Sequence, residues 1–235
     1  MKVIHQGILL RKINYSESSL ILRFYTLENG IQSYIFQGGK KKKGNFLQPL
    51  SIVEIEAYFR PDSELGKITS ISPIVVFKSI PFNPLKSGMA FFIAEIIDSC
   101  LKSVDHEPPT YDFLKNEITW LDLSEEITNY PIWFLIRFSD YLGFVPKLSA
   151  PNPTFFDLEE GELTAHRPAG HTYIQDSSVA FIPLFLNQTK EELLALTIGK
   201  KDRSLLLTNC LTYYKYHIDG FKTPKSLAVL QTIFN

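Results

Sequence analysis

Along the first eighty residues, hydrophobic positions come in short runs that are separated by turn residues. The runs are rich in branched and aromatic residues, and the one over 51–59 alternates apolar with charged positions, so that one face can be buried. Asn29-Gly30 separates two runs, because this pair tolerates the positive φ angles of tight hairpins. We expect strands over residues 3–13, 20–27, 31–37, 51–59 and 67–77. Such a series suits a small closed barrel of the OB type.

After Pro81 the hydrophobic pattern changes its period. Apolar residues recur every three or four positions, as in a helix that buries one face. We expect helices over residues 85–102, 111–121, 132–142, 201–217 and 224–234. The predicted fold class is therefore α+β, with an N-terminal OB-fold β-barrel over residues 1–80 and a mostly α-helical C-terminal domain over residues 81–235. An irregular excursion near 147–176, rich in proline, glycine and acidic residues, interrupts the helical domain.

The net charge of −1 conceals an uneven distribution along the chain. Residues 1–80 carry 11 lysines and arginines against 6 acidic residues, a net charge of +5. Residues 81–235 carry 13 against 19, a net charge of −6, which restores the total. The asymmetry indicates that the N-terminal part binds a polyanion and that the helical part has another role.

The most distinctive polar feature is the run Lys40-Lys41-Lys42-Lys43 between Gly39 and Gly44. Adjacent ammonium groups cannot neutralise one another, so the run either attracts a phosphate backbone or forms a solvated surface loop. On an OB barrel, charge for the backbone and rings for the bases are the means of binding single strands. The residues that can extend this surface are Arg11, Lys12, Arg23 and Lys67. The candidate rings for stacking on bases are Tyr34, Phe36 and Phe46, and Tyr15 and Tyr58 are further candidates. Rings of these types are also common in protein cores.

The sequence provides no positive signal for an enzyme, a metal site or a cofactor. Gly38-Gly39-Lys40 lacks the spacing and the hydroxyl of a P-loop. His166 and His171 flank a loop rather than one face of a helix, and the acidic residues near 157–162 lack the order of a calcium-binding loop. We therefore expect no metal, no cofactor and no catalytic residues.

Cellular location also follows from the distribution of apolar residues and cysteines. The longest apolar stretch, residues 89–100, is interrupted by Glu95 and Asp98, so we expect no membrane interaction. Cys100 and Cys210 lie far apart, each in a segment patterned as a buried helix. Two core thiols in the reduced cytoplasm are the simplest interpretation.

Arg137 is a single cation in an otherwise apolar helical segment. Its stem can cover the edge of the core while the charge reaches solvent. Alternatively, it anchors an acidic, hydrophobic peptide beside an apolar groove. Both interpretations stay open.

Taken together, the chain resembles the RecO family of recombination mediators. In the N-terminal part the resemblance rests on residues 7–12, residues 15–22, Thr26, Gly30, Gly38 with its basic run, and residues 47–50. In the C-terminal part it rests on residues 141–146, which read Tyr-Leu-Gly-Phe-Val-Pro, on residues 213–217 and on residues 225–227. These pieces keep their order over nearly the whole chain.

The resemblance implies a mediator of DNA repair and recombination in the RecF pathway, associated with the nucleoid. Such a protein binds single- and double-stranded DNA, anneals complementary strands and assists RecA loading on strands covered by single-strand-binding protein. Its partners would be RecR and the acidic C-terminal tail of single-strand-binding protein, with RecA reached indirectly. By similarity the lysine run, Arg11 and Arg23 would contact phosphates, and Arg137 gains support as the peptide anchor.

One family feature is missing from this sequence. Many members carry a four-cysteine zinc site in the excursion after the Leu-Gly-Phe-x-Pro motif, and residues 147–174 contain no cysteine. We therefore expect this segment to be held by apolar contacts, through Phe155, Phe156, Leu158, Leu163 and Tyr173.

A second hypothesis comes from a different functional class. The chain would be a non-catalytic adaptor that binds proteins through its acidic helical domain. Neutralising residues 40–43 distinguishes the two, because a mediator would lose DNA affinity whereas an adaptor would keep its partner.

Overall fold

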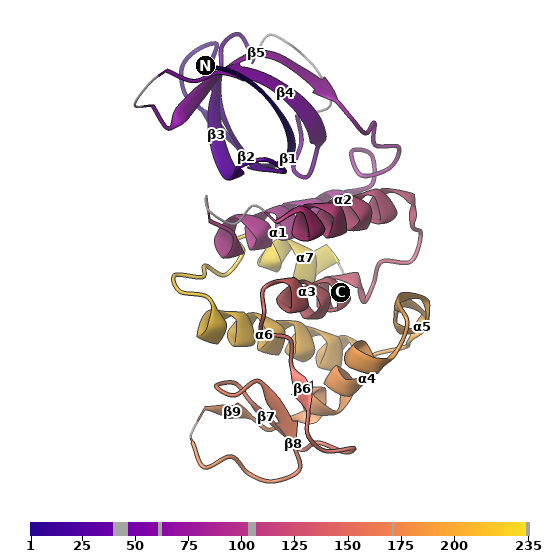
Figure 1. Ribbon diagram of the computed structural model, residues 1–235. Coiled ribbons are helices and arrows are strands. Elements are labelled where there is room, and N and C mark those ends of the chain that lie inside the picture. The colour runs from indigo at the N-terminus through magenta and orange to yellow at the C-terminus, as the bar shows by residue number, and fades with distance from the viewer. Residues whose placement is uncertain (40–46, 61–62, 103–106, 171, 234–235) are drawn as a thin grey trace. The chain divides into compact units, whose positions relative to one another are not determined.

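The computed structural model describes residues 1–39, 47–60, 63–102, 107–170 and 172–233. Its chain divides into two compact units, each of which has its own core (Figure 1). The first comprises Met1–Ser124 together with Pro224–Ile233, and the second comprises Glu125–Thr223. The first unit thus groups the N-terminal strands with the two helices that follow them and with the C-terminal helix. The boundary expected at residue 80 stays a prediction.

The first unit contains the predicted barrel. Its strands are β1 (Lys2–Asn14), β2 (Leu20–Thr26), β3 (Gly30–Phe36), β4 (Ile52–Tyr58) and β5 (Leu65–Pro73). They close in the order β1-β2-β3-β5-β4, with β3 and β5 parallel and the other neighbours antiparallel. All five strands expected from the apolar runs are present, and the OB-type barrel is confirmed.

The interior of the barrel is filled by aromatic and branched side chains. Tyr34 lies at its centre with no exposed surface, and its ring meets Phe24 and Phe59 edge to face at centroid distances of 5.8 and 5.6 Å. Gly66 on β5 lets these rings approach the backbone, because a Cβ there would lie 2.7 Å from Tyr34 and from Phe59. Close packing of this kind leaves room for a single side-chain arrangement.

His5 satisfies the buried hydroxyl of Tyr34. The His5 Nδ1 and the Tyr34 Oη lie 2.6 Å apart, and the His5 Nε2 lies 3.0 Å from the Asn29 Nδ2. Burial lowers the pKa of His5 below its usual 6.5, although nearby Glu28 opposes this shift. The imidazole is therefore held neutral inside the barrel.

Three helices complete the first unit. They are α1 (Pro84–Cys100), α2 (Pro108–Leu123) and α7 (Leu227–Ile233), and α1 packs against β1, α2 and α7 (Figure 1). Asn83 caps α1, because its side chain accepts hydrogen bonds from the backbone amides of Leu85 and Lys86. Ser226 donates its N–H and its hydroxyl to Glu95, at 3.0 and 2.8 Å, and so ties the C-terminal segment to α1.

Asp122 at the end of α2 holds the linker that leaves the barrel. Its carboxylate accepts the backbone N–H groups of Lys78, Ser79 and Ile80 at 2.7, 2.8 and 2.8 Å. The ammonium group of Lys86 donates to the Ser79 hydroxyl and to the Asp122 carbonyl oxygen at 2.7 and 2.9 Å. The cluster thus fixes the chain direction between β5 and α1.

The second unit is built around the long helix α6. Its helices are α3 (Tyr130–Tyr141), α4 (Ile182–Asn187), α5 (Lys190–Ala195) and α6 (Lys200–His217), with a 3-10 turn over Ser177–Phe181. Asn129 donates its side-chain amide to the carbonyls of Leu193 and Leu196 and so links the start of α3 to α5. The hydroxyl of Tyr214 donates to the Leu135 carbonyl at 2.6 Å and joins α6 to α3.

The excursion forms a small sheet instead of an irregular loop. Its strands are β6 (Lys147–Leu148), β7 (Phe155–Asp157), β8 (Glu162–Thr164) and β9 (Tyr173–Ile174), in the order β6-β8-β7-β9. Phe156, Leu158 and Leu163 are buried, and Phe155 meets Tyr173 edge to face at 5.4 Å. These apolar contacts match those expected for a segment without cysteines. Among the described residues, no group of three His, Cys, Asp or Glu side chains could hold a metal ion.

Both cysteines are buried, in α1 and α6, as the helical patterns predicted. Burial raises the pKa of the Cys210 thiol to about 12, so the thiol stays protonated and unreactive at neutral pH. None of the helices within the described ranges is long and apolar enough to cross a bilayer.

We expect Asp122→Ala to lower the free energy of unfolding by about 3 kcal/mol, because three backbone donors, one buried and two part-buried, lose their acceptor. Burial raises the pKa of Asp122, but the backbone hydrogen bonds from residues 78–80 outweigh it and leave the pKa below 3.8. The stabilisation is therefore complete above pH 4 or so and disappears as the pH falls through the folded-state pKa. Urea titrations measure both effects, and the exposed Asp112→Ala on the same helix is the control that should change stability little.

Because the folded protein keeps His5 neutral, we predict a second dependence of folding stability on pH, which comes from a base and not from a carboxylic acid. Because its pKa is lower in the folded state, the unfolded chain takes up more protons, and stability falls as the pH drops below about 6.5. We expect His5→Gln to flatten this slope in melting temperatures measured between pH 5.5 and 7.5. His166→Gln, at an exposed position, should leave the slope as it is, and an unchanged slope in His5→Gln would contradict the assignment.

Candidate functional site

The strand register brings three of the predicted basic residues onto the outer surface of the barrel. Arg11 on β1 lies opposite Arg23 on β2, which in turn lies opposite Ser33 on β3. Lys67 on β5 lies opposite Ile35 on β3, in the neighbouring row of side chains. Arg11 and Lys67 are exposed and Arg23 is half-buried. Arg11 and Arg23 are thus neighbours on adjacent strands, and Lys67 lies on β5, on the far side of β3 from them.

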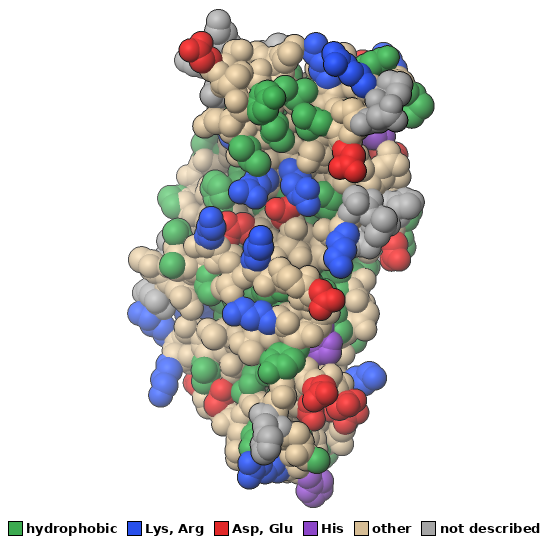
Figure 2. Space-filling view, turned by 90° about the vertical axis from the view of Figure 1, so that its left-hand side faces the viewer, with side chains coloured by type: hydrophobic (Ala, Val, Ile, Leu, Met, Phe, Trp, Pro, Cys, Tyr) green, Lys and Arg blue, Asp and Glu red, His purple; other side chains and the backbone are tan. Residues whose placement is uncertain are grey.

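Apolar and aromatic side chains separate the charges on this surface. The row that contains Lys67 runs through Ile13, Ile21, Ile35, Lys67, Tyr58 and Lys2 on consecutive strands. Tyr58, which is 49% exposed, lies beside Lys67 and Lys2. We call these six residues, together with Arg11 and Arg23, the outer basic face; the row crosses all five strands and returns to β1, so it passes around the closed barrel. On the side of the barrel seen in Figure 2, hydrophobic side chains are flanked by lysines and arginines.

The structure corrects two of the predicted stacking residues. Tyr34 and Phe36 are 0% and 3% exposed and belong to the barrel core, so their rings are not available to bases. The Tyr34 hydroxyl avoids the cost of burial by its contact with His5, a partner 29 positions away. The exposed rings are instead Tyr15 and Tyr58, at 59% and 49%.

The lysine run and one ring lie outside the described residues. Lys40, Lys41, Lys42, Lys43 and Phe46 therefore keep the status of predictions. The described chain reaches the run at Gly39, directly after β3. The Cβ that Gly39 lacks would meet Phe36 at 2.7 Å, so the backbone passes close to the core at this point.

A cleft of about 830 Å³ adjoins Arg23. It is lined by residues 31–33 of β3, by residues 63–65 at the start of β5, and by the end of α1, including Asp98 and Lys102. Arg23 donates its Nε–H to the Asp98 carboxylate, and the two form an ion pair. Sequence reasoning missed Asp98, because a contact across 75 positions produces no local signal.

In the second unit, Arg137 is half-buried on α3. The described residues include no hydrogen-bond or ion-pair partner for it, which leaves both interpretations of this residue open.

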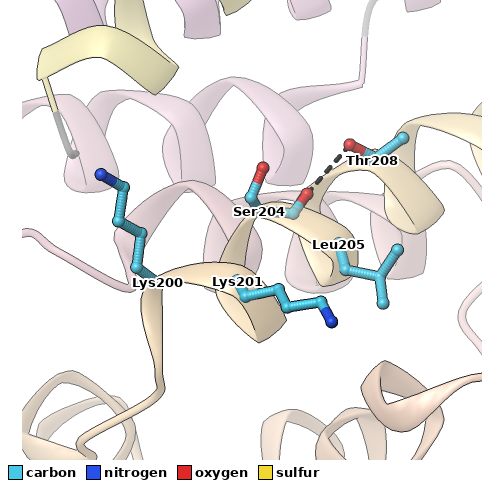
Figure 3. Close-up of a pocket in the computed structure, with 5 residues that line it drawn as sticks. All are labelled: Lys200, Lys201, Ser204, Leu205 and Thr208. Carbon is cyan, nitrogen blue, oxygen red and sulfur yellow. Dashed lines mark hydrogen bonds between the residues drawn. The ribbon is translucent and has the colours of Figure 1, made fainter.

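A separate pocket of about 550 Å³ lies along α6 and is lined by Lys200, Lys201, Ser204, Leu205 and Thr208. Figure 3 shows the two lysines diverging, with Leu205 on the side of Lys201 and the Thr208 hydroxyl donating to the Ser204 carbonyl at 2.9 Å. Lys201 and Leu205, which lie on the same side, suit a ligand that is both acidic and apolar.

Two family models match successive parts of the chain. Recombination protein O N terminal matches residues 1–77, and Recombination protein O C terminal matches residues 81–227. The first covers the barrel, and the second covers the helices together with the small sheet.

Curated relatives match over the whole length. The DNA repair protein RecO of Flavobacterium psychrophilum is 31% identical over 242 residues, with 100% of both chains covered. Its counterpart from Phocaeicola vulgatus is 31% identical over 235 residues, 97% of this chain and 98% of the relative. That of Bacteroides fragilis is 30% identical over 236 residues, with the same shares. The chain therefore belongs to the RecO family of DNA repair proteins.

Proposed function

We propose that this protein is a non-catalytic mediator of recombinational repair that binds DNA through the outer basic face of its barrel. In this role it binds single- and double-stranded DNA, anneals complementary strands and assists RecA loading on strands covered by single-strand-binding protein. The protein would act at the nucleoid, in the cytoplasm, with RecR as a partner. The observation that carries the proposal is that Arg11 and Arg23 lie opposite each other on β1 and β2, with Lys67 beside Tyr58 in the neighbouring row of side chains.

The chemistry of this surface fits a nucleic acid strand. Guanidinium and ammonium groups neutralise phosphates, and a ring beside them gives a base a surface for stacking. Tyr58 provides such a ring next to Lys67. The isoleucines between the charges offer apolar contact to sugars and bases without sequence preference. The lysine run, which follows β3 in the sequence, would add phosphate contacts.

Acting on strands that already carry protein requires a contact with that protein. We place the acidic tail of single-strand-binding protein on the second unit, with Arg137 and the α6 pocket as alternative anchors. The pocket offers two lysines and one leucine, whereas Arg137 offers one cation on α3. The adaptor hypothesis uses the same surfaces and differs in requiring no DNA contact by the barrel.

We predict that changing Lys40, Lys41, Lys42 and Lys43 to alanine weakens binding of labelled single-stranded DNA and makes its salt dependence shallower.

Lys67→Ala should reduce the slope of log affinity against log salt by about 0.7, the value for one phosphate contact on a single strand. Tyr58→Leu should weaken binding by about 1–3 kcal/mol without changing the slope, because stacking releases no counterions. Fluorescence anisotropy at several salt concentrations measures all three variants.

The matched control for the ring is Tyr216→Leu, at a tyrosine that is 54% exposed on α6. It should leave both affinity and slope unchanged. If the unmodified protein fails to bind DNA even at low salt, the mediator proposal is wrong and the adaptor hypothesis takes its place. If the four-lysine variant keeps both its partner binding and its DNA affinity, the lysine run does not contact phosphates as proposed.

The two candidate peptide anchors give different expectations. If the α6 pocket holds the acidic tail, Lys200→Ala combined with Lys201→Ala weakens binding of a labelled tail peptide about tenfold, and Arg137→Ala has little effect. If Arg137 is the anchor, the effects are reversed. Peptide anisotropy distinguishes them, with Lys147→Ala, an exposed lysine of the same unit, as the control. Equal, small effects in all variants would remove both sites from consideration.

A further inference from the structure

The ion pair between Arg23 and Asp98 links the outer basic face of the barrel to helix α1. Arg23 donates from β2, and Asp98 accepts near the end of α1. The side chains keep 36% and 21% of their surface exposed, so the pair is accessible from solvent. Both residues also line the cleft of about 830 Å³, so a ligand in the cleft can reach either partner.

The surroundings of Arg23 explain why it needs an anion. Arg11 lies directly opposite on β1, and like charges in opposed positions of neighbouring strands destabilise a sheet. The Asp98 carboxylate relieves this repulsion. A phosphate offers the same arrangement, since its anionic oxygens accept charge-assisted N–H bonds from a guanidinium as a carboxylate does.

We propose that Asp98 occupies, in the free protein, the place that a DNA phosphate takes on Arg23, so that DNA binding at the cleft requires Asp98 to release the guanidinium. This inference rests on the proposed DNA binding of the barrel and adds a regulatory contact to it. The carboxylate keeps the strand-binding surface partly neutralised until a strand competes for it.

The exchange has consequences for both affinity and salt dependence. A phosphate that replaces Asp98 gains one contact with the Arg23 guanidinium, but the Asp98 carboxylate stays close by. Repulsion between the phosphate and this carboxylate offsets part of the gain. The same carboxylate reduces the net neutralisation of the strand and therefore the release of its counterions. Asp98 is thus a residue that tunes DNA binding without donating to DNA.

The test uses the full chain and a labelled oligothymidine of about 20 nucleotides, longer than the roughly 4–16 that one OB fold covers. Asp98→Asn should tighten binding about two- to fivefold at low salt, the range expected from a partly exposed ion pair. The salt slope should become steeper by up to about 0.7. Arg23→Gln should weaken binding, and adding Asp98→Asn to it should produce no further gain.

Two controls separate this effect from charge alone and from misfolding. Glu54→Gln removes one exposed carboxylate from β4, away from the residues that line the cleft, and should change affinity far less. Melting temperatures show whether Asp98→Asn keeps the fold. In the unmodified protein, the 15N-detected Arg23 Nε–H resonance, identified by its loss in Arg23→Gln, should shift when the oligonucleotide is added.

The outcomes distinguish the exchange at Arg23 from the proposed DNA binding on which it rests. Unchanged affinity in Asp98→Asn, an equal gain in Glu54→Gln, or a gain that persists without Arg23 overturns the exchange, while the DNA binding of the unmodified protein still supports the mediator. Absence of binding in the unmodified protein and in every variant overturns both. An Arg23 resonance that does not move while DNA binds also overturns the exchange, whatever the variants do.

Discussion

The arrangement of the first unit depends on the hydrogen bonds that Asp122 accepts from the linker after the barrel. Three consecutive backbone amides, at Lys78, Ser79 and Ile80, converge on one carboxylate at the end of α2. Because the linker is fixed, α1 begins at a defined place and runs against β1. Its far end then brings Asp98 to Arg23 on the barrel. A buried carboxylate that is satisfied by backbone donors thus decides which charged groups meet on the surface more than twenty residues away along the chain.

Closing the barrel divides its residues into two chemically different sets. The inner set, with Tyr34, Phe36 and Phe24, is packed and sealed, and it uses His5 to satisfy its one deep hydroxyl. The outer set is mixed, with cations spaced by isoleucines and one exposed tyrosine in the row of Lys67. In the proposed function, this outer set would hold a strand by its phosphates and by nonspecific apolar contact. Rings inside the barrel cannot contribute to such a surface.

The second unit shows how a small sheet can be held by apolar packing in a segment without cysteines. Phe156 and Leu163 are buried from the sheet side, and the hydroxyl of Tyr213 on α6 donates to the Phe144 carbonyl at 2.6 Å. Gly161 permits this approach, since a Cβ there would lie 2.4 Å from the Tyr213 hydroxyl oxygen, and its φ of +69° also favours glycine. Phe144 stacks on His217 with centroids 5.0 Å apart. The segment is thereby attached to α6 through rings.

The sequence by itself determined the elements whose signals are local. Runs of branched and aromatic residues between turn residues predicted the five strands, three-four periodicity predicted the long helices, and the order of motifs predicted the family. The short helices α4 and α5 and the strands of the excursion were missed, because two to six residues carry too little periodicity. The direction of Tyr34 and Phe36, the row that joins Tyr58 to Lys67, and the pairing of Arg23 with Asp98 were decided by tertiary structure alone. Each depends on strand register or on contacts between distant segments, and these follow from the closure of the barrel and the path of the chain, which no local pattern encodes.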